Sequence, residues 1–261
     1  MTRKLGRLPR AHNSSIPHMS ALMAGKPVPV LPPTVDNASA LPADGLGQML
    51  NDTLGDCTCA AVYHAIQVWT AAARGVEITE PDSDVQALYE QACGYNPADP
   101  NTDQGGVEQD VLTFLLKTGA PIQPSPAPRV RHLIAAFVEV DPRMLDDVRA
   151  AIYECGVSYI GFNVPAYIMA QEPPAVWDVD PSADNSIVGG HAVVLTGYDA
   201  SGFDFISWGK KYRMTFAFFA KFTDESYAIA DPSWIEATGK TPGGLTPAAL
   251  EAQMAALKAG A

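Results

Sequence analysis

The chain has 261 residues, of which 47% are hydrophobic and 18% charged, and its formal net charge is −12. This composition is typical of a globular protein and excludes a disordered or fibrous one. The negative balance argues against a nucleic acid or a membrane surface as the partner. No apolar run reaches the roughly 20 residues of a transmembrane helix, and no signal-peptide pattern follows the first basic residues.

The first 45 residues are predicted to form an extended arm outside the core. Seven of the 22 prolines lie in residues 1–45, which show neither helical nor strand periodicity. Residues 1–26 carry five basic side chains and no acidic one, whereas the rest of the chain is acidic. Three interpretations stay open: a solvated tail, docking onto an acidic partner, and self-association with a neighbouring copy.

The next part of the chain is predicted to be helical. Apolar residues recur at helical spacing in four segments: 58–73, 82–95, 105–119 and 141–156. Gly75 and Gly119 end the first and third of these helices. In the fourth, Asp141 is the expected N-cap, Pro142 takes the first helical position and Gly156 follows the end.

Strands are predicted after the last of these helices. Five short segments are rich in β-branched or aromatic residues: 157–164, 191–199, 202–209, 213–222 and 227–231. Helices followed by strands predict an α+β protein with an antiparallel sheet. We expect one domain over residues 46–235, and a Gly/Pro linker with a short helix over residues 236–261.

The four cysteines are too few for a disulfide scaffold, so we interpret them as thiols. Cys57, in "NDTLGDCT", stands where a loop becomes a helix. Backbone N–H groups and the helix dipole favour a thiolate at that point, as a nucleophile requires. A structural cysteine is the alternative.

Geometry excludes two neighbours of Cys57 from its chemistry. His64 lies about 10 Å further along the helix and so is no base for it. Cys59 points about 200° away, which also argues against a shared zinc ion. We therefore predict no metal and no cofactor. His191, which opens the strand "HAVVLTGYD" after two glycines, is the remaining candidate base.

The motifs "NDTLGDCT", "GGHAVVLTGYD" and "SWG" resemble those of the papain-like cysteine peptidases. They are similar above all to the double-glycine-leader-peptidase-like proteins of tailed bacteriophages and prophages. The resemblance covers about residues 45–230 and implies a papain-like α+β fold, with the cysteine-bearing helix packed against an antiparallel sheet. It also implies a catalytic site of Cys57 as nucleophile, His191 as base and acid, Asn51 with the Cys57 backbone N–H around the oxyanion, and Ser207 orienting His191.

Two of these positions depart from the family pattern. Asn51 replaces the usual Gln, and its side chain is one methylene shorter. The shorter side chain puts at risk the hydrogen bond to the oxyanion, which is worth about 3 kcal/mol when it is made. Ser207 replaces the usual Asn or Asp and supports an imidazolium less well than a carboxylate. If "SWG" is instead matched to the family's "NSWG", Ile206 takes the position of the orienting residue, and its side chain cannot orient an imidazole. Trp208 is expected to shield the histidine or to lie in the core.

The leading functional hypothesis is a papain-like cysteine hydrolase, a peptidase acting on a peptide or protein substrate. The alternative is a phage or prophage virion structural protein of the capsid, neck or tail with little or no turnover, whose arm contacts virion proteins or another copy. Hydrolysis of peptidoglycan amides is a third possibility, and the arm could also fold over the cleft as a pro-segment. The expected location is the cytoplasm of a bacterial host or the virion.

Overall fold

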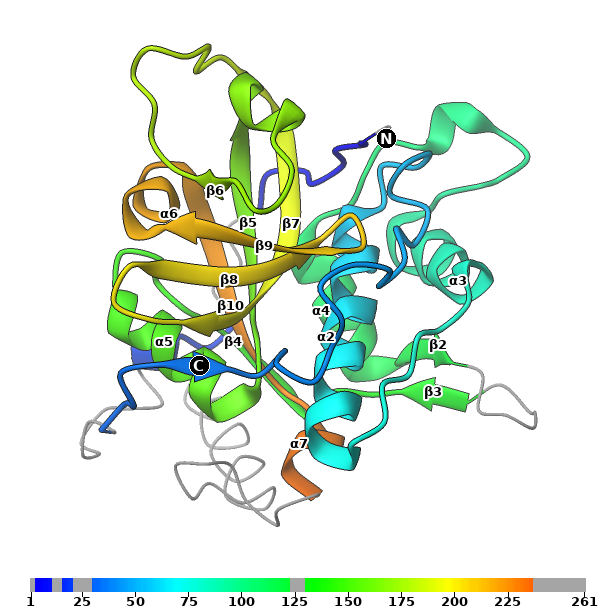
Figure 1. Cartoon of the computed structure of the whole chain (residues 1–261). Coiled ribbons are helices and arrows are strands. Elements are labelled where there is room, and N and C mark those ends of the chain that lie inside the picture. Colours follow the sequence, from blue (N-terminus) through cyan, green and yellow to red (C-terminus); the bar gives the residue numbers. More distant parts are fainter. Residues whose placement is uncertain (1–2, 11–15, 21–29, 123–129, 237–261) are drawn as a thin grey trace.

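The computed structural model describes residues 3–10, 16–20, 30–122 and 130–236, which form a helical half and a sheet half (Figure 1). The described helices are α2 (Cys57–Arg74), α3 (Asp82–Cys93), η1 (Pro100–Thr102), α4 (Glu108–Lys117), α5 (Leu145–Cys155), η2 (Ala166–Ala170), α6 (Phe216–Phe222) and α7 (Pro232–Glu236). No helix in these described ranges has the length and apolar character needed to cross a membrane.

The large sheet is almost entirely antiparallel, which confirms the predicted α+β fold. Its strands run in the order β4 (Ala136–Glu139), β10 (Thr223–Ala230), β5 (Ser158–Pro165), β7 (Ile187–Tyr198), β8 (Gly202–Ser207), β9 (Lys210–Thr215) and β6 (Val176–Trp177), and β1 (Val35–Asp36) also pairs with β7. Only β6 and β9 pair in parallel among the described strands. A second, two-stranded sheet joins β2 (Ala120–Ile122) to β3 (Val130–His132).

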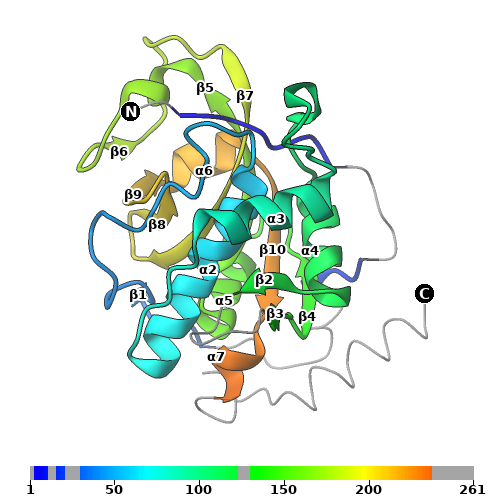
Figure 2. The same cartoon turned by 90° about the vertical axis from the view of Figure 1, so that its right-hand side faces the viewer.

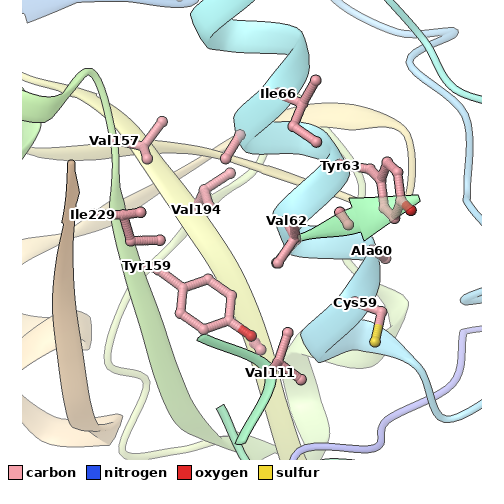
Figure 3. Close-up of a cluster of buried hydrophobic side chains, with 14 of the residues drawn as sticks. Cys59, Ala60, Val62, Tyr63, Ile66, Val111, Val157, Tyr159, Val194 and Ile229 are labelled. Carbon is pink, nitrogen blue, oxygen red and sulfur yellow. The ribbon is translucent and has the colours of Figure 1, made fainter. Parts of the chain in front are cut away.

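Helix α2 packs against the centre of the sheet. Figure 3 shows Val62 on the side of α2 that faces Tyr159 of β5 and Val194 of β7, with Tyr63 and Cys59 on the other side. Gly75 ends the helix as predicted, with a left-handed φ of 68°. The side chains that pack on the sheet recur at the helical repeat along α2. Cys57, the first residue of α2, lies beside β7.

The predicted strand over 213–222 is wrong in its second half. Strand β9 ends at Thr215, whose side chain accepts a hydrogen bond from Phe218 N at 3.1 Å and so caps α6. The aromatic residues that suggested a strand bury one face of this short helix instead. Asp141 is also not the N-cap of α5, because its carboxylate accepts the Arg143 N–H in a preceding turn.

Within the first 45 residues, the described parts, 3–10, 16–20 and 30–45, contribute to the core instead of lying outside it. Strand β1 pairs with β7. Ile16, Ala38 and Leu41 are buried in the same apolar cluster as the side chains of α2. The short helix predicted after Thr246 lies outside the described residues.

Candidate active site

Cys57 is the first residue of α2 and is 1% exposed. The carbonyl of Asp56 accepts the N–H groups of Cys59 and Ala60, which starts the helix, and the Asp56 side chain does not cap it. The Cys57 sulfur meets the backbone N–H of Ala192 on β7, a contact that favours the thiolate. The cysteine is therefore held at the junction of the two halves, beside the residue that follows His191.

His191 and Ser207 are brought together by the pairing of β7 with β8. Nε2 of His191 lies 2.7 Å from Ser207 Oγ. Ile206 is fully buried in the apolar core, so Ser207 rather than Ile206 faces the histidine. Nδ1 of His191 has no hydrogen-bond partner among the described residues. With Nε2 engaged, Nδ1 is the ring nitrogen left to exchange a proton with a nucleophile.

Trp208 covers the imidazole. Its ring stacks on that of His191 with centroids 4.4 Å apart and planes at 12°, and Phe162 contacts the imidazole edge-on. Trp208 has a left-handed φ of 44° in the turn between β8 and β9, an unusual conformation for a large side chain. The turn thus directs this indole over the histidine, which was one of its two predicted roles.

Asn51 lies next to this site, but its side chain forms its hydrogen bond within its own loop. The amide donates to Leu54 O at 3.2 Å. It also contacts the Asp56 carboxyl group. Burial raises the pKa of this carboxyl group well above its ordinary value, and the contact with Asn51 partly opposes that rise. The oxyanion role of Asn51 stays a prediction, whereas the Cys57 N–H, at a helix start, remains a suitable donor.

The first described residues of the chain, 3–10, cross the site. In Figure 2 they run in dark blue over the upper end of α2 toward α3 and α4. Main-chain hydrogen bonds fix this segment to both halves of the body: Lys4 N to Asn51 O (3.0 Å), Arg7 N to Gly190 O (3.1 Å), Leu8 N to Gly106 O (2.9 Å) and Gly106 N to Gly6 O (2.8 Å). We call residues 3–10 the cleft segment.

Gly6 is the residue of the cleft segment whose backbone contacts Cys57. Its backbone group lowers the pKa of the Cys57 thiol, as an N–H donated to sulfur does. A Cβ at Gly6 would lie 1.8 Å from the Gly55 carbonyl oxygen. Only glycine therefore fits this close approach.

Burial favours the neutral forms of both the Cys57 thiol and the His191 imidazole. Burial raises the pKa of Cys57 to about 12. Burial, followed by the positive charges of Arg3 and Arg7, lowers the pKa of His191 to about 3. The sequence predicted a depressed thiol pKa, so that expectation is wrong for this covered state. The helix start and the Ala192 N–H do not outweigh desolvation.

The two excluded neighbours of Cys57 lie as predicted. His64 is buried, and its Nδ1 lies 2.8 Å from Gln67 Oε1 within its own helix, whereas its Nε2 has no hydrogen-bond partner among the described residues. Cys59 has its sulfur 4.0 Å from that of Cys93, away from the site. All four cysteines are free thiols. Within the described part of the chain, no cluster of His, Cys, Asp or Glu has the arrangement of a metal site.

Sequence analysis included an arm folded over the cleft among its possibilities, but it did not identify the residues that hold the cleft segment there. The available signal was its charge, since a basic segment on an acidic body has a partner within the same chain. Arg3 and Arg7 form ion pairs with Glu172 and Glu225 respectively. The described part of the arm is therefore not a solvated tail.

Solved cysteine proteases share this architecture. Xylellain from Xylella fastidiosa has a TM-score of 0.63 and 18% identity, covering 88% of this chain and 98% of its own. A procathepsin B from Trypanosoma congolense has a TM-score of 0.59 and 14% identity, covering 88% of this chain and 87% of its own. The proform of Amb a 11, a ragweed pollen allergen, has a TM-score of 0.54 and 16% identity, covering 80% and 68%.

The fold is that of the papain-like cysteine proteases. No protein-family model matches the chain, and no curated protein sequence matches it at a significant level. None of the three proteases is named as a phage protein, so the finer resemblance to phage and prophage proteins stays a prediction.

Proposed function

We propose that the protein is a cysteine peptidase whose thiol is Cys57 and whose base is His191, and that the cleft segment holds it in a latent state. The observation that carries this proposal is the arrangement around His191. Ser207 engages one ring nitrogen, Trp208 covers the ring, and the other nitrogen has no partner among the described residues.

In the proposed reaction the Cys57 thiol transfers its proton to His191 Nδ1 as sulfur attacks the acyl carbon of a peptide bond. The oxyanion that forms accepts the Cys57 backbone N–H. His191 then protonates the leaving amine as the C–N bond breaks. Water attacks the thioester, gives a proton back to His191, and releases the acid and the free thiol. Ser207 Oγ accepts the Nε2–H and holds the ring in the tautomer that leaves Nδ1 basic.

The cleft segment suits an inhibitor better than a substrate. The Cys57 sulfur accepts a hydrogen bond from the backbone N–H of Gly6. Attack needs the sulfur to meet a carbonyl carbon at close range. The positive charges of Arg3 and Arg7 also oppose the imidazolium that the reaction must form.

Hydrolysis of a random peptide library tests the activity, with the full-length chain and its Gly6→Ala variant compared side by side. We expect cleavage by Gly6→Ala, because the added Cβ displaces the cleft segment. Adding Cys57→Ala should abolish cleavage, whereas Cys93→Ala should leave it unchanged. Equal cleavage with and without Cys57 would contradict the proposal.

The second candidate function is the virion structural protein with little turnover. It is favoured by the neutral Cys57 and His191 and by the Asn51 amide, which is engaged within its own loop. If Gly6→Ala cleaves no peptide while its Cys57 is readily alkylated, and the protein co-purifies with virions, this candidate replaces the peptidase.

A further inference from the structure

The Arg7 side chain lies in a buried acidic pocket beside the candidate active site. It is 2% exposed and forms an ion pair with Glu225, which is fully buried. Its Nη1 lies 2.8 Å from Asp224 Oδ1, and its Nη2 lies 3.4 Å from Asn163 Oδ1. Both terminal nitrogens of the guanidinium therefore have acceptors, whereas Nε has none among the described residues.

A third carboxyl group, that of Glu108, faces the same space. Glu108 is fully buried, and neither of its oxygens has a hydrogen-bond partner among the described residues. Gly161 lies between it and Arg7, because a Cβ there would lie 2.5 Å from both Glu108 Oε1 and Arg7 Cδ. The absence of a side chain at position 161 therefore makes room for a long side chain next to this carboxyl group.

The pocket belongs to the body of the protein. Glu108 begins α4 in the helical half, and Asp224 and Glu225 lie on β10 in the sheet half. Burial raises the pKa values of both the Glu108 and the Glu225 carboxyl groups above their ordinary values, and the Arg7 charge opposes this rise. A buried acidic site of this kind favours a cationic occupant, because leaving it empty or filling it with a neutral side chain leaves buried carboxyl groups uncompensated.

The pocket has a fixed position relative to the reacting sulfur. Arg7 directly follows Gly6, whose backbone meets Cys57. The Arg7 main chain bonds to Gly190, and both of its neighbours bond to Gly106. Another peptide using these main-chain partners would place one side chain in the pocket, within one residue of the bond at Cys57.

We propose that the pocket of Glu108, Asp224 and Glu225 selects an arginine side chain of the substrate within one residue of the scissile bond. Arg7 is then the internal occupant that a substrate arginine replaces. This inference rests on the proposed peptidase function for its biological meaning, although the recognition of arginine can be measured without turnover. Negatively charged side chains are rejected at this position because they would meet buried carboxyl groups.

Peptide binding tests the proposal on the full chain carrying Gly6→Ala and Cys57→Ala, which frees the pocket and prevents cleavage. The probe is the peptide RKLGRLPR with blocked ends, compared with the same peptide carrying citrulline in place of its central arginine. Citrulline keeps the shape and lacks the charge. We expect citrulline to weaken binding by about 30-fold or more, since losing one partner of a buried charge pair has effects of that size.

Two further variants locate the effect. Adding Glu225→Gln should reduce the difference between the two peptides to a few-fold, whereas Glu139→Gln, which removes the partner of Arg10 outside the pocket, should leave it intact. If Gly6→Ala does not fold, Arg7→Ala frees the pocket in its place. Equal binding of the two peptides in a folded variant would overturn the proposal.

Cleavage-site mapping separates this inference from the proposed function. If Gly6→Ala cleaves the library, arginine should be enriched within one residue of the cut bond, and Glu225→Gln should remove the enrichment. Discrimination between the peptides without any cleavage would uphold the pocket and overturn the peptidase. Cleavage without preference for arginine would uphold the peptidase and overturn the arginine pocket.

Discussion

Two stretches of the proline-rich N-terminal region dock on the body by different physical means. The cleft segment, residues 3–10, is held by main-chain hydrogen bonds and by the ion pairs of its arginines. Residues 35–46 join the sheet through β1 and bury Leu41 and Leu46 in the core. The two stretches therefore have different roles: residues 35–46 are part of the fold, whereas the cleft segment covers a site whose residues Cys57, His191 and Ser207 come from other elements.

The difference predicts which property each stretch controls. Apolar side chains contribute to stability roughly in proportion to the area that they bury. Ion pairs of a docked segment instead set how often the segment leaves its site. Substitutions in residues 35–46 should therefore change the free energy of unfolding, and substitutions in the cleft segment should change access to Cys57.

The largest expected effect is on stability, from Leu46→Ala. Leu46 is fully buried and its carbonyl accepts the Gln67 side-chain amide at 2.8 Å. Truncation should lower the free energy of unfolding by about 3 kcal/mol, because it leaves a cavity in the core. Urea denaturation measures this, with exposed Val30→Ala as the matched control of little effect.

Native-state alkylation of Cys57 in Leu46→Ala should stay close to that of the unchanged chain. A large increase in Cys57 alkylation without a loss of stability would show that residues 35–46 also guard the site, and would remove the distinction between the two stretches.

Gly6→Ala should have the next largest effect, on thiol reactivity. The pKa of Cys57 is raised to about 12, so very little thiolate exists at neutral pH. Displacing the cleft segment should return the thiol toward its ordinary pKa and raise the iodoacetamide rate at pH 7 by about 100-fold. Mass spectrometry of the alkylated peptide measures the alkylation rate of Cys57, with Cys155 of the same chain as the internal control.

The free energy of unfolding should fall by less in Gly6→Ala than in Leu46→Ala, because displacing the cleft segment opens the carboxyl groups of the Arg7 pocket to water and leaves the side chains around Leu46 packed. An unchanged alkylation rate together with a strongly reduced stability would mean that the cleft segment is structural, as residues 35–46 are.

The sequence was most informative where the signal is local. Helical spacing predicted α2, and short segments rich in β-branched or aromatic residues predicted β5 and β7, since each signal lies within its own segment. The run 213–222 misled because its aromatic residues suit either a strand or a short helix, and the Thr215 cap decided the outcome. The resemblance to papain-like peptidases supplied the pairing of His191 with Ser207, which lie 16 residues apart.

The pocket around Arg7 could not be predicted in the same way. Its carboxyl groups come from Glu108, Asp224 and Glu225, which lie on two elements in different halves of the fold. Nothing in the composition tells these from the other acidic residues of the chain. Their burial, and the position of the cleft segment between them, follow only from tertiary packing.

Acid should weaken the attachment of residues 35–46 through His64. This histidine pairs with Gln67, whose amide donates to Leu46 O. Burial lowers the His64 pKa from 6.5 to about 4, so the unfolded chain takes up the proton first as the pH falls. Stability from the neutral, buried His64 is therefore complete above pH 6.5 and is lost between pH 6.5 and 4, with about 2 kcal/mol lost by pH 5.

Urea denaturation at pH 7.5 and pH 5 measures this contribution by comparing the unchanged chain with His64→Gln. The variant should lose about 2 kcal/mol less over that interval, while buried His191 continues to contribute to both proteins. The same pH dependence in both chains would show that His64 does not sense acid for this stretch.

The smallest expected effect comes from Glu139→Gln at the outer end of the cleft segment. Glu139 pairs with Arg10, whose side chain is 38% exposed, whereas the Arg7 side chain is 2% exposed. Exposed ion pairs contribute at most about 1 kcal/mol, so Cys57 alkylation should rise less than about fivefold. Glu225→Gln makes the same chemical change at the buried pair and should raise alkylation far more, measured in the same assay. If the two variants raise it equally, the cleft segment is held by its overall charge, and the Arg7 pocket has no special part in closing the site.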